Sequence, residues 1–265
     1  MLIDAHTHLN GELLFPNRQQ HLEDFERVGG KMLVNAGANE FYNQNALTIA
    51  QEAKILFPKL KVKSTLGYLP GDIQHFRKND FSQMIQKVEE LYLKHMEHIV
   101  AIGETGIDLH YPNGANLEDQ QYMFRLQAEL ARKYQLPLVV HSRDAFDETM
   151  EVLQDFTDVK LYFHCRGYGA EEVKRAEQMF SRLRLGFTGV ITYPKAHATR
   201  ESLWAMKTSK VLIETDAPYL PPQDFRGKTN YPAYVRYVYE KCAEVLEIGK
   251  EELENQVEEN FCNIF

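Results

Sequence analysis

The sequence is poor in cysteine and has no long hydrophobic run. Its three cysteines, Cys165, Cys242 and Cys262, form no Cys-x-x-Cys pair. An odd number without such pairing argues against a disulfide framework and favours a reducing compartment, so we expect a cytoplasmic protein. No stretch approaches the roughly 20 apolar residues that cross a bilayer, and Asp4 interrupts the N-terminal segment, so we expect neither a membrane span nor a secretory signal.

The sequence also lacks a surplus of basic residues. Lysine and arginine number 30 against 38 aspartates and glutamates, which gives a net charge of −8. A nucleic-acid substrate would therefore need a local basic patch or bound cations. Low-complexity segments, short repeats and Pro/Gly/Ser-rich linkers are absent too, so we expect residues 1–265 to form a single domain.

Short apolar runs alternate with segments of helical period along the whole chain. The predicted strands are 2–6, 31–36, 62–66, 99–103, 136–141, 160–164, 183–188 and 211–214, and the predicted helices are about 19–29, 41–56, 81–96, 118–135, 144–156, 170–181 and 199–209, with a helical tail over about 231–263. Alternation of this kind predicts a parallel sheet, and eight repeats favour a closed barrel. The predicted fold class is an α/β single-domain (β/α)₈ TIM barrel with a C-terminal helical tail.

The helix predicted over 118–135 can be tested by its spacing. Met123, Leu126, Leu130 and Tyr134 recur at intervals of three and four residues, which indicates one buried face. Asn116 is the predicted N-cap, because its side-chain oxygen can accept from a free backbone N–H of the first turn.

Potential metal ligands stand where five predicted strands end. Two histidines separated by one residue in an extended segment point to the same side, so the first pair can reach one cation. A single strand-end histidine or aspartate is more often a helix cap or a paired polar residue, but six at the same barrel face favour a metal site. Six ligands exceed one tetrahedral zinc and suit two divalent ions, Zn²⁺, Mn²⁺ or Mg²⁺, sharing a bridging carboxylate. The six candidates are His6, His8, Glu104, His141, His164 and Asp216, whereas His21, His75, His95, His98 and His197 are interpreted as ordinary structural histidines.

These residues carry a resemblance to a known family. The chain resembles the TatD family of metal-dependent deoxyribonucleases, within the amidohydrolase-like barrels, and the likeness spans essentially its whole length. The segments that carry it are Ile3–His8, Gly103–Asp108, His141–Arg143, His164–Cys165, Thr215–Leu220 and Arg226–Lys228, the last followed by Asn230 and Pro232.

The resemblance implies a division of labour among these residues. His6, His8 and Asp216 would hold one metal, His141 and His164 the other, and Glu104 would bridge them. Asp216 and Glu104 are then the predicted catalytic residues, Asp216 also accepting a proton from the attacking water. Arg143, Arg226 and Lys228 would hold substrate phosphate oxygens, although solvated loop charges are the alternative interpretation.

The resemblance further implies a hydrolase of phosphodiester bonds, a DNase of 3′–5′ exonuclease type, with DNA or another phosphodiester as partner and no membrane. A monomer is compatible with the sequence. Two positions depart from the family pattern: Leu69 stands where members carry histidine, and Tyr231 where they carry glutamate. The substrate is therefore less sharply predicted than the chemistry.

Two alternative functions stay open. Related barrels cleave other esters, lactones or amides, but many bridge their metals with a carboxylated lysine at the place of Glu104. The alternative of another class is a catalytically inactive metal-binding protein. Loop aromatics could stack on bases or simply pack against the protein. These are Tyr68, Tyr111, Tyr193, Phe225 and Tyr231.

Overall fold

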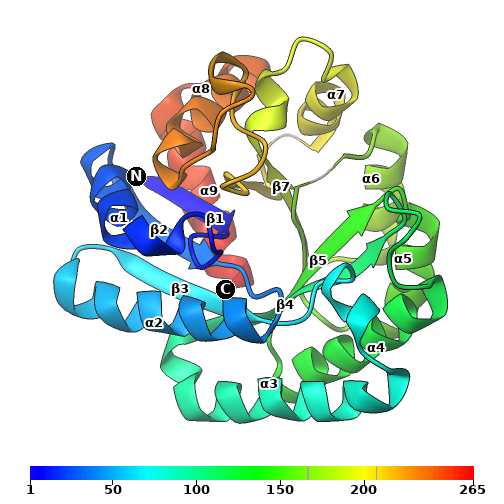
Figure 1. The fold of residues 1–265 in the computed structure, drawn as a ribbon. Coiled ribbons are helices and arrows are strands. Elements are labelled where there is room, and N and C mark those ends of the chain that lie inside the picture. The colour runs from blue at the N-terminus through cyan, green and yellow to red at the C-terminus, as the bar shows by residue number, and fades with distance from the viewer. Residues whose placement is uncertain (166, 207) are drawn as a thin grey trace.

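The computed structural model describes residues 1–165, 167–206 and 208–265. Eight parallel strands form one sheet in sequence order and curl into a nearly closed barrel with helices outside (Figure 1). The strands are β1 (Leu2–Thr7), β2 (Gly30–Asn35), β3 (Lys61–Leu66), β4 (Ile99–Asp108), β5 (Leu138–Arg143), β6 (Leu161–Phe163), β7 (Leu183–Phe187) and β8 (Val211–Ile213). The predicted single-domain TIM barrel is confirmed.

Helices follow the strands in the predicted order. They are α1 (Arg18–Arg27), α2 (Glu40–Leu56), α3 (Phe81–His95), α4 (Leu117–Tyr134), α5 (Phe146–Leu153), α6 (Ala170–Met179), α7 (His197–Met206), α8 (Val235–Leu246) and α9 (Lys250–Ile264). The helix predicted over 199–209 begins two residues earlier, and its position 207 lies outside the described residues.

Helix α4 has the predicted face and cap. Met123 and Leu130 are buried, and Leu126 and Tyr134 pack half-buried against the core. Asn116 caps the helix by accepting a hydrogen bond from the backbone N–H of the third helical residue. Burial of this stripe fixes the helix against β4 and β5.

The predicted helical tail over about 231–263 consists of two helices, α8 and α9. Glu247 adopts a left-handed conformation with φ of 55° and ends α8, and Gly249 precedes α9. Pro232 begins a short 3-10 turn before α8. Asn260 of α9 donates to the carbonyl oxygens of Thr208 and Val211, 2.7 and 2.9 Å away. Helix α9 therefore lies at the amino-terminal end of the barrel, away from the end where barrel active sites form.

The seam between β8 and β1 closes just beyond the strand ends. The backbone N–H of Asp216 donates to the carbonyl oxygen of His6 over 3.0 Å, and that of His8 donates to Ala217 over 2.7 Å. The Asp4 carboxylate accepts from both the N–H and the hydroxyl of Thr215, at 2.9 and 2.6 Å. These bonds bring the residues after β8 beside those of β1.

Candidate metal centre

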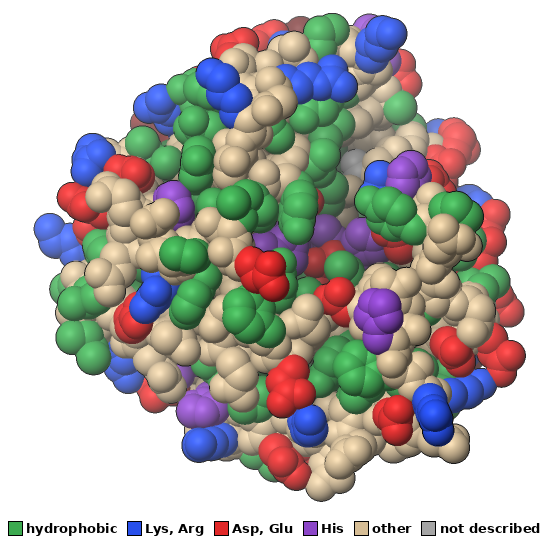
Figure 2. Space-filling model, viewed as in Figure 1, with side chains coloured by type: hydrophobic (Ala, Val, Ile, Leu, Met, Phe, Trp, Pro, Cys, Tyr) green, Lys and Arg blue, Asp and Glu red, His purple; other side chains and the backbone are tan. Residues whose placement is uncertain are grey.

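The six candidate ligands lie at the carboxyl end of the barrel. His6 belongs to β1, Glu104 to β4 and His141 to β5, while His8, His164 and Asp216 follow β1, β6 and β8. Five of the six are buried and His141 is half-buried. In Figure 2, viewed onto this end, histidine side chains lie at the bottom of a central hollow with acidic side chains beside them.

Glu104 lies between two groups of ligand atoms. Its Oε1 is 2.8 Å from Nδ1 of His141 and 2.6 Å from Nε2 of His164. Its Oε2 is 3.3 Å from Nε2 of His6 and 3.4 Å from Nε2 of His8. One carboxylate thus faces both groups, with one oxygen toward each.

Asp216 completes the group on the Oε2 side. Its Oδ1 lies 3.7 Å from Nε2 of His6 and 3.4 Å from Nε2 of His8. Among the described residues, three groups have metal-ligand spacing: His6, His8 and Asp216; Glu104, His141 and His164; and His6, His164 and Glu214. The first two groups bring together the residues that the resemblance assigned to each cation, and their role as metal ligands stays a prediction.

The backbone around Glu104 is fixed by close approach to β5. Gly103 and Gly106 have φ of 134° and 143°, which favour glycine. A Cβ on Gly106 would lie 1.9 Å from the carbonyl oxygen of His141. The N–H of Glu104 donates to Gly37 over 2.7 Å. Together these contacts direct the carboxylate into the barrel mouth.

Two further carboxylates surround the cluster, and sequence reasoning missed both. Asp108 lies 2.9 Å from Nε2 of His141 and so fixes the orientation of that ring. Glu214 is fully buried, accepts from Tyr162 and from the N–H of Cys165, and forms a third potential ligand group with His6 and His164. Asp108 belongs to the segment Gly103–Asp108 and Glu214 to the end of the eighth predicted strand, and both segments were noted in the sequence. Only the folded structure shows which histidine ring each carboxylate approaches.

The ionisation of the cluster is strongly perturbed. Burial disfavours protonated His8, but the carboxylates of Asp216 and Glu104 outweigh it and raise the pKa of His8 to about 10. Burial likewise opposes protonation of His141, while Asp108 and Glu104 raise its pKa to about 9. Burial lowers the pKa of His6 to about 4. Glu104 is buried, yet the surrounding histidines hold its pKa well below the usual range.

The donor set fits divalent cations. Among the described residues, Oε2 of Glu104 and Nδ1 of both His8 and His164 are buried without a hydrogen-bond partner. Buried carboxylates need compensating positive charge, and the raised pKa values of His8 and His141 are one response to that need. Divalent ions among imidazole nitrogens and carboxylate oxygens would supply the same charge with the ligand chemistry that Zn²⁺ and Mn²⁺ prefer.

The predicted phosphate-binding residues lie at the rim. The Arg143 guanidinium lies 5.3 Å from the centre of the Tyr111 ring and donates to its hydroxyl over 3.3 Å. Arg226 lies 4.8 Å from the centre of the Tyr193 ring. Lys228 follows it on an exposed turn through Gly227, which has φ of 83°. Both arginines are exposed cations resting on tyrosines.

The remaining loop aromatics pack against the protein. Phe225 stacks on Tyr234 with ring centres 4.2 Å apart, and Tyr231 lies 5.0 Å from His21. Tyr68 is buried. Base stacking therefore has no support from these three side chains.

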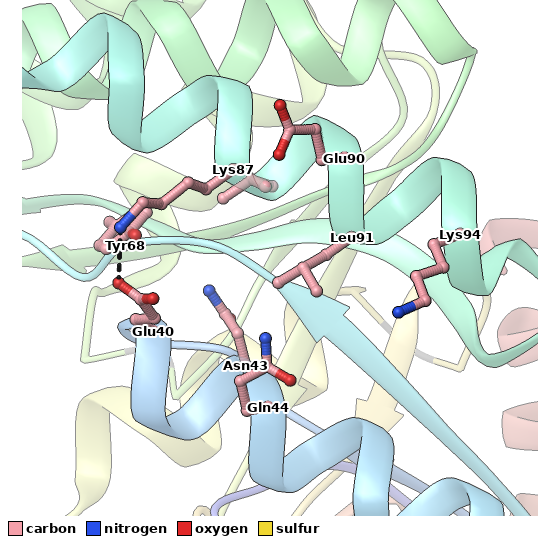
Figure 3. Close-up of a pocket in the computed structure, with 9 residues that line it drawn as sticks. Glu40, Asn43, Gln44, Tyr68, Lys87, Glu90, Leu91 and Lys94 are labelled. Carbon is pink, nitrogen blue, oxygen red and sulfur yellow. Dashed lines mark hydrogen bonds and ion pairs between the residues drawn. The ribbon is translucent and has the colours of Figure 1, made fainter.

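A groove of about 300 Å³ lies outside the barrel, between α2 and α3 (Figure 3). Glu40 and Lys87 pair across it over 3.0 Å, and Tyr68 closes one end. None of the six candidate ligands lines this groove. It is an inter-helical groove with paired charges, separate from the barrel mouth.

The fold and this buried histidine–carboxylate cluster define a barrel hydrolase of the metal-dependent class. The sequence model described as "TatD related DNase" matches residues 3–265. The chain belongs to the TatD family of metal-dependent hydrolases. Among the described residues, no helix combines the length and apolar character needed to cross a membrane.

Relatives cover the whole chain. YabD of Bacillus subtilis, described as an uncharacterized metal-dependent hydrolase, is 31% identical over 267 residues, spanning 100% of this chain and 99% of YabD. The crystal structure of YjjV, a TatD homologue from Escherichia coli, superposes with a TM-score of 0.87 at 25% identity, covering 100% of this chain and 97% of YjjV. A TatD family hydrolase from Entamoeba histolytica shares the fold, with a TM-score of 0.86 at 21% identity over 100% of this chain and 97% of its own.

Proposed function

We propose that the protein hydrolyses phosphodiester bonds with two divalent cations, and that DNA is a substrate. The observation that carries the proposal is the position of Glu104, whose two oxygens face two separate ligand groups. His6, His8 and Asp216 would hold one cation, and His141 and His164 the other. Divalent cations, when bound, supply Lewis acidity toward phosphate oxygens and an activated water.

The protein's own groups supply proton transfer and orientation. Glu104 and Asp216 are the two carboxylates among the six candidate ligands. Asp216 lies at the mouth, so its carboxylate can accept the proton of an attacking water. Asp108 holds the ring of His141 through Nε2, which leaves Nδ1 directed at the centre of the cluster.

Phosphate rather than lactone or amide specificity is supported by the rim. Arg143 and Arg226 present planar guanidinium groups that can hold non-bridging oxygens in pairs. These cations also offset locally the net charge of −8. The three cysteines are all free, which supports the predicted reducing, cytoplasmic location.

The test is a parallel assay of the metal-loaded protein. Single-stranded DNA oligonucleotides, bis(p-nitrophenyl) phosphate, a lactone panel and a phosphotriester are assayed with Mg²⁺, Mn²⁺ and Zn²⁺. We expect metal-dependent turnover of the two phosphodiesters, abolished by chelation. Turnover confined to lactones or phosphotriesters would reject the proposal in favour of the alternative hydrolase, and metal binding without any turnover would favour the inactive protein.

A further inference from the structure

The wall of the mouth beside His8 is built of hydroxyl groups. The rings of Tyr42 and Tyr219 stand edge-on to the His8 ring, with centres 5.7 and 6.0 Å away. The hydroxyl of Tyr42 lies over Gly11, where an added Cβ would come within 2.8 Å of it, and it interacts with the hydroxyl of Tyr219. Tyr219 is 54% exposed, so this pair borders the open mouth.

A carboxylate in the connection after β3 extends this wall, and the exposed Glu12 also acts on the Tyr42 hydroxyl. Asp72 begins a short turn, Asp72–His75, in the connection after β3, and it is half-buried. The side chain of Asn39 donates to its Oδ2 over 2.8 Å, and Asn39 in turn caps α2 by accepting from the N–H of Tyr42 over 3.0 Å. Among the described residues, no hydrogen bond engages Oδ1 of Asp72. The charge of this carboxylate acts on the Tyr42 and Tyr219 hydroxyls.

The opposite part of the rim has the opposite charge. Arg143 stands at the end of β5 on Tyr111, and Arg226 rests on Tyr193, which follows β7. The rim therefore carries a carboxylate and tyrosine hydroxyls beside β2 and β3. Near β5 and β7 it carries two exposed guanidinium groups, with Asp108 and Asp144 close to Arg143. A uniformly anionic chain cannot lie equally well on both sides, because phosphate is attracted to one and repelled by the other.

We propose that Asp72, with Tyr42 and Tyr219, forms a subsite for the hydroxyl-bearing terminal sugar of a phosphodiester chain and excludes a terminal phosphate. This proposal rests on the phosphodiesterase function proposed above. The carboxylate accepts a hydrogen bond from the sugar hydroxyl, and the tyrosine rings cover the sugar, while the phosphates of the chain run toward Arg143 and Arg226. The site would thus act at a chain end, with Asp72 as a specificity-determining residue.

The test compares chain ends. The metal-loaded protein and Asp72→Asn are assayed on oligonucleotides ending in a 3′-hydroxyl or a 3′-phosphate, and on the corresponding pair of 5′ ends. We expect the wild-type protein to prefer the hydroxyl by about tenfold or more in kcat/KM at one end, the scale of repulsion between two anions in a partly hydrated site. Asp72→Asn keeps an acceptor for Asn39 and should reduce that preference to within about twofold. Glu90→Gln, which makes the same charge change on the exposed surface of α3, should keep it.

A binding measurement gives a second readout without turnover. Calorimetry with thymidine 5′-phosphate, thymidine 3′-phosphate and thymidine 3′,5′-bisphosphate should show that the bisphosphate binds about tenfold more weakly than one of the two monophosphates. Asp72→Asn should remove this difference.

The outcomes separate this proposal from the function on which it rests. Hydrolysis of phosphodiesters with equal rates on hydroxyl and phosphate ends, or a preference that Asp72→Asn leaves intact, would overturn the subsite alone. A faster reaction of ribose ends than of deoxyribose ends that carry the same number of phosphates would show a preference for the 2′-hydroxyl. That result would overturn the assignment of the subsite to the terminal hydroxyl of the chain. Failure to hydrolyse any phosphodiester would overturn both.

Discussion

Replacing Glu104 with glutamine removes the one negative charge that both ligand groups share while keeping the shape of the side chain. Its two oxygens lie between 2.6 and 3.4 Å from four histidine nitrogens. Removing one partner of a buried charge pair costs about 3–5 kcal/mol. At about 1.4 kcal/mol for each factor of ten, this corresponds to a loss of roughly 10²- to 4 × 10³-fold in metal affinity.

The assay is metal content together with turnover. After equilibration with Mn²⁺ or Zn²⁺ and gel filtration, we expect two ions per wild-type chain and at most one per Glu104→Gln chain, measured by plasma mass spectrometry. Hydrolysis of bis(p-nitrophenyl) phosphate should fall by at least about a thousandfold, since positioning of both ions is lost. Glu90→Gln serves as the matched control, because it removes the same charge from an exposed helix. Two retained ions with full turnover in Glu104→Gln would refute the bridging role.

Gly106→Ala should lower the free energy of unfolding by about 2–4 kcal/mol in urea titrations, because its Cβ would lie 1.9 Å from the His141 carbonyl. Gly167→Ala, with open space around it, should change the free energy of unfolding little, and similar values for the two variants would contradict the packing described. Metal affinity should rise between pH 6 and pH 9, with release of protons on binding. The raised pKa values of His8 and His141, about 10 and about 9, keep both rings protonated in the metal-free protein until the pH passes those values. Calorimetry in buffers of different ionisation enthalpy measures the number of protons released, and a metal affinity that does not change with pH would argue against these histidines as ligands. Asp108→Asn should weaken metal binding about 10- to 100-fold by loosening the His141 ring, with a smaller loss of stability, and unchanged affinity would exclude the positioning role.

The fold was predictable because burial leaves a regular trace in the sequence. Each strand core is an apolar run, and each helix has one buried stripe, as in α4. Where polar site residues interrupt an apolar run, the predicted strand boundary is wrong. Strand β4 was expected to end at Gly103 but continues to Asp108, because the polar Glu104 points into the mouth and Thr105 accepts from Gln127 of α4, while the backbone still pairs with β5 after a register shift.

The break between α8 and α9 was not predictable from the sequence. The apolar residues of the tail repeat with helical period on both sides of Glu247, so periodicity predicts a helical tail but does not locate the break within it. The break comes from a left-handed residue that is not glycine. Glutamate has no special preference for that conformation, so the sequence carries little signal of it.

The sequence predicted those site residues that stand at the ends of strands. In a parallel barrel every carboxyl end meets at one face, so ligands such as His6 and Asp216, far apart in the chain, could be expected to converge. Partners that depend on side-chain direction were not predictable. Asp108 reaches His141, and Asp72 joins the wall beside His8 through Asn39, by contacts that only the folded loops define.

Anomalous diffraction from crystals grown with Mn²⁺ or Zn²⁺ would locate the bound cations directly. We expect two strong peaks in each molecule, one among His6, His8 and Asp216 and one beside His141 and His164, with Glu104 between them. A barrel mouth without a peak under these conditions, or a single ion held only by surface carboxylates, would contradict it.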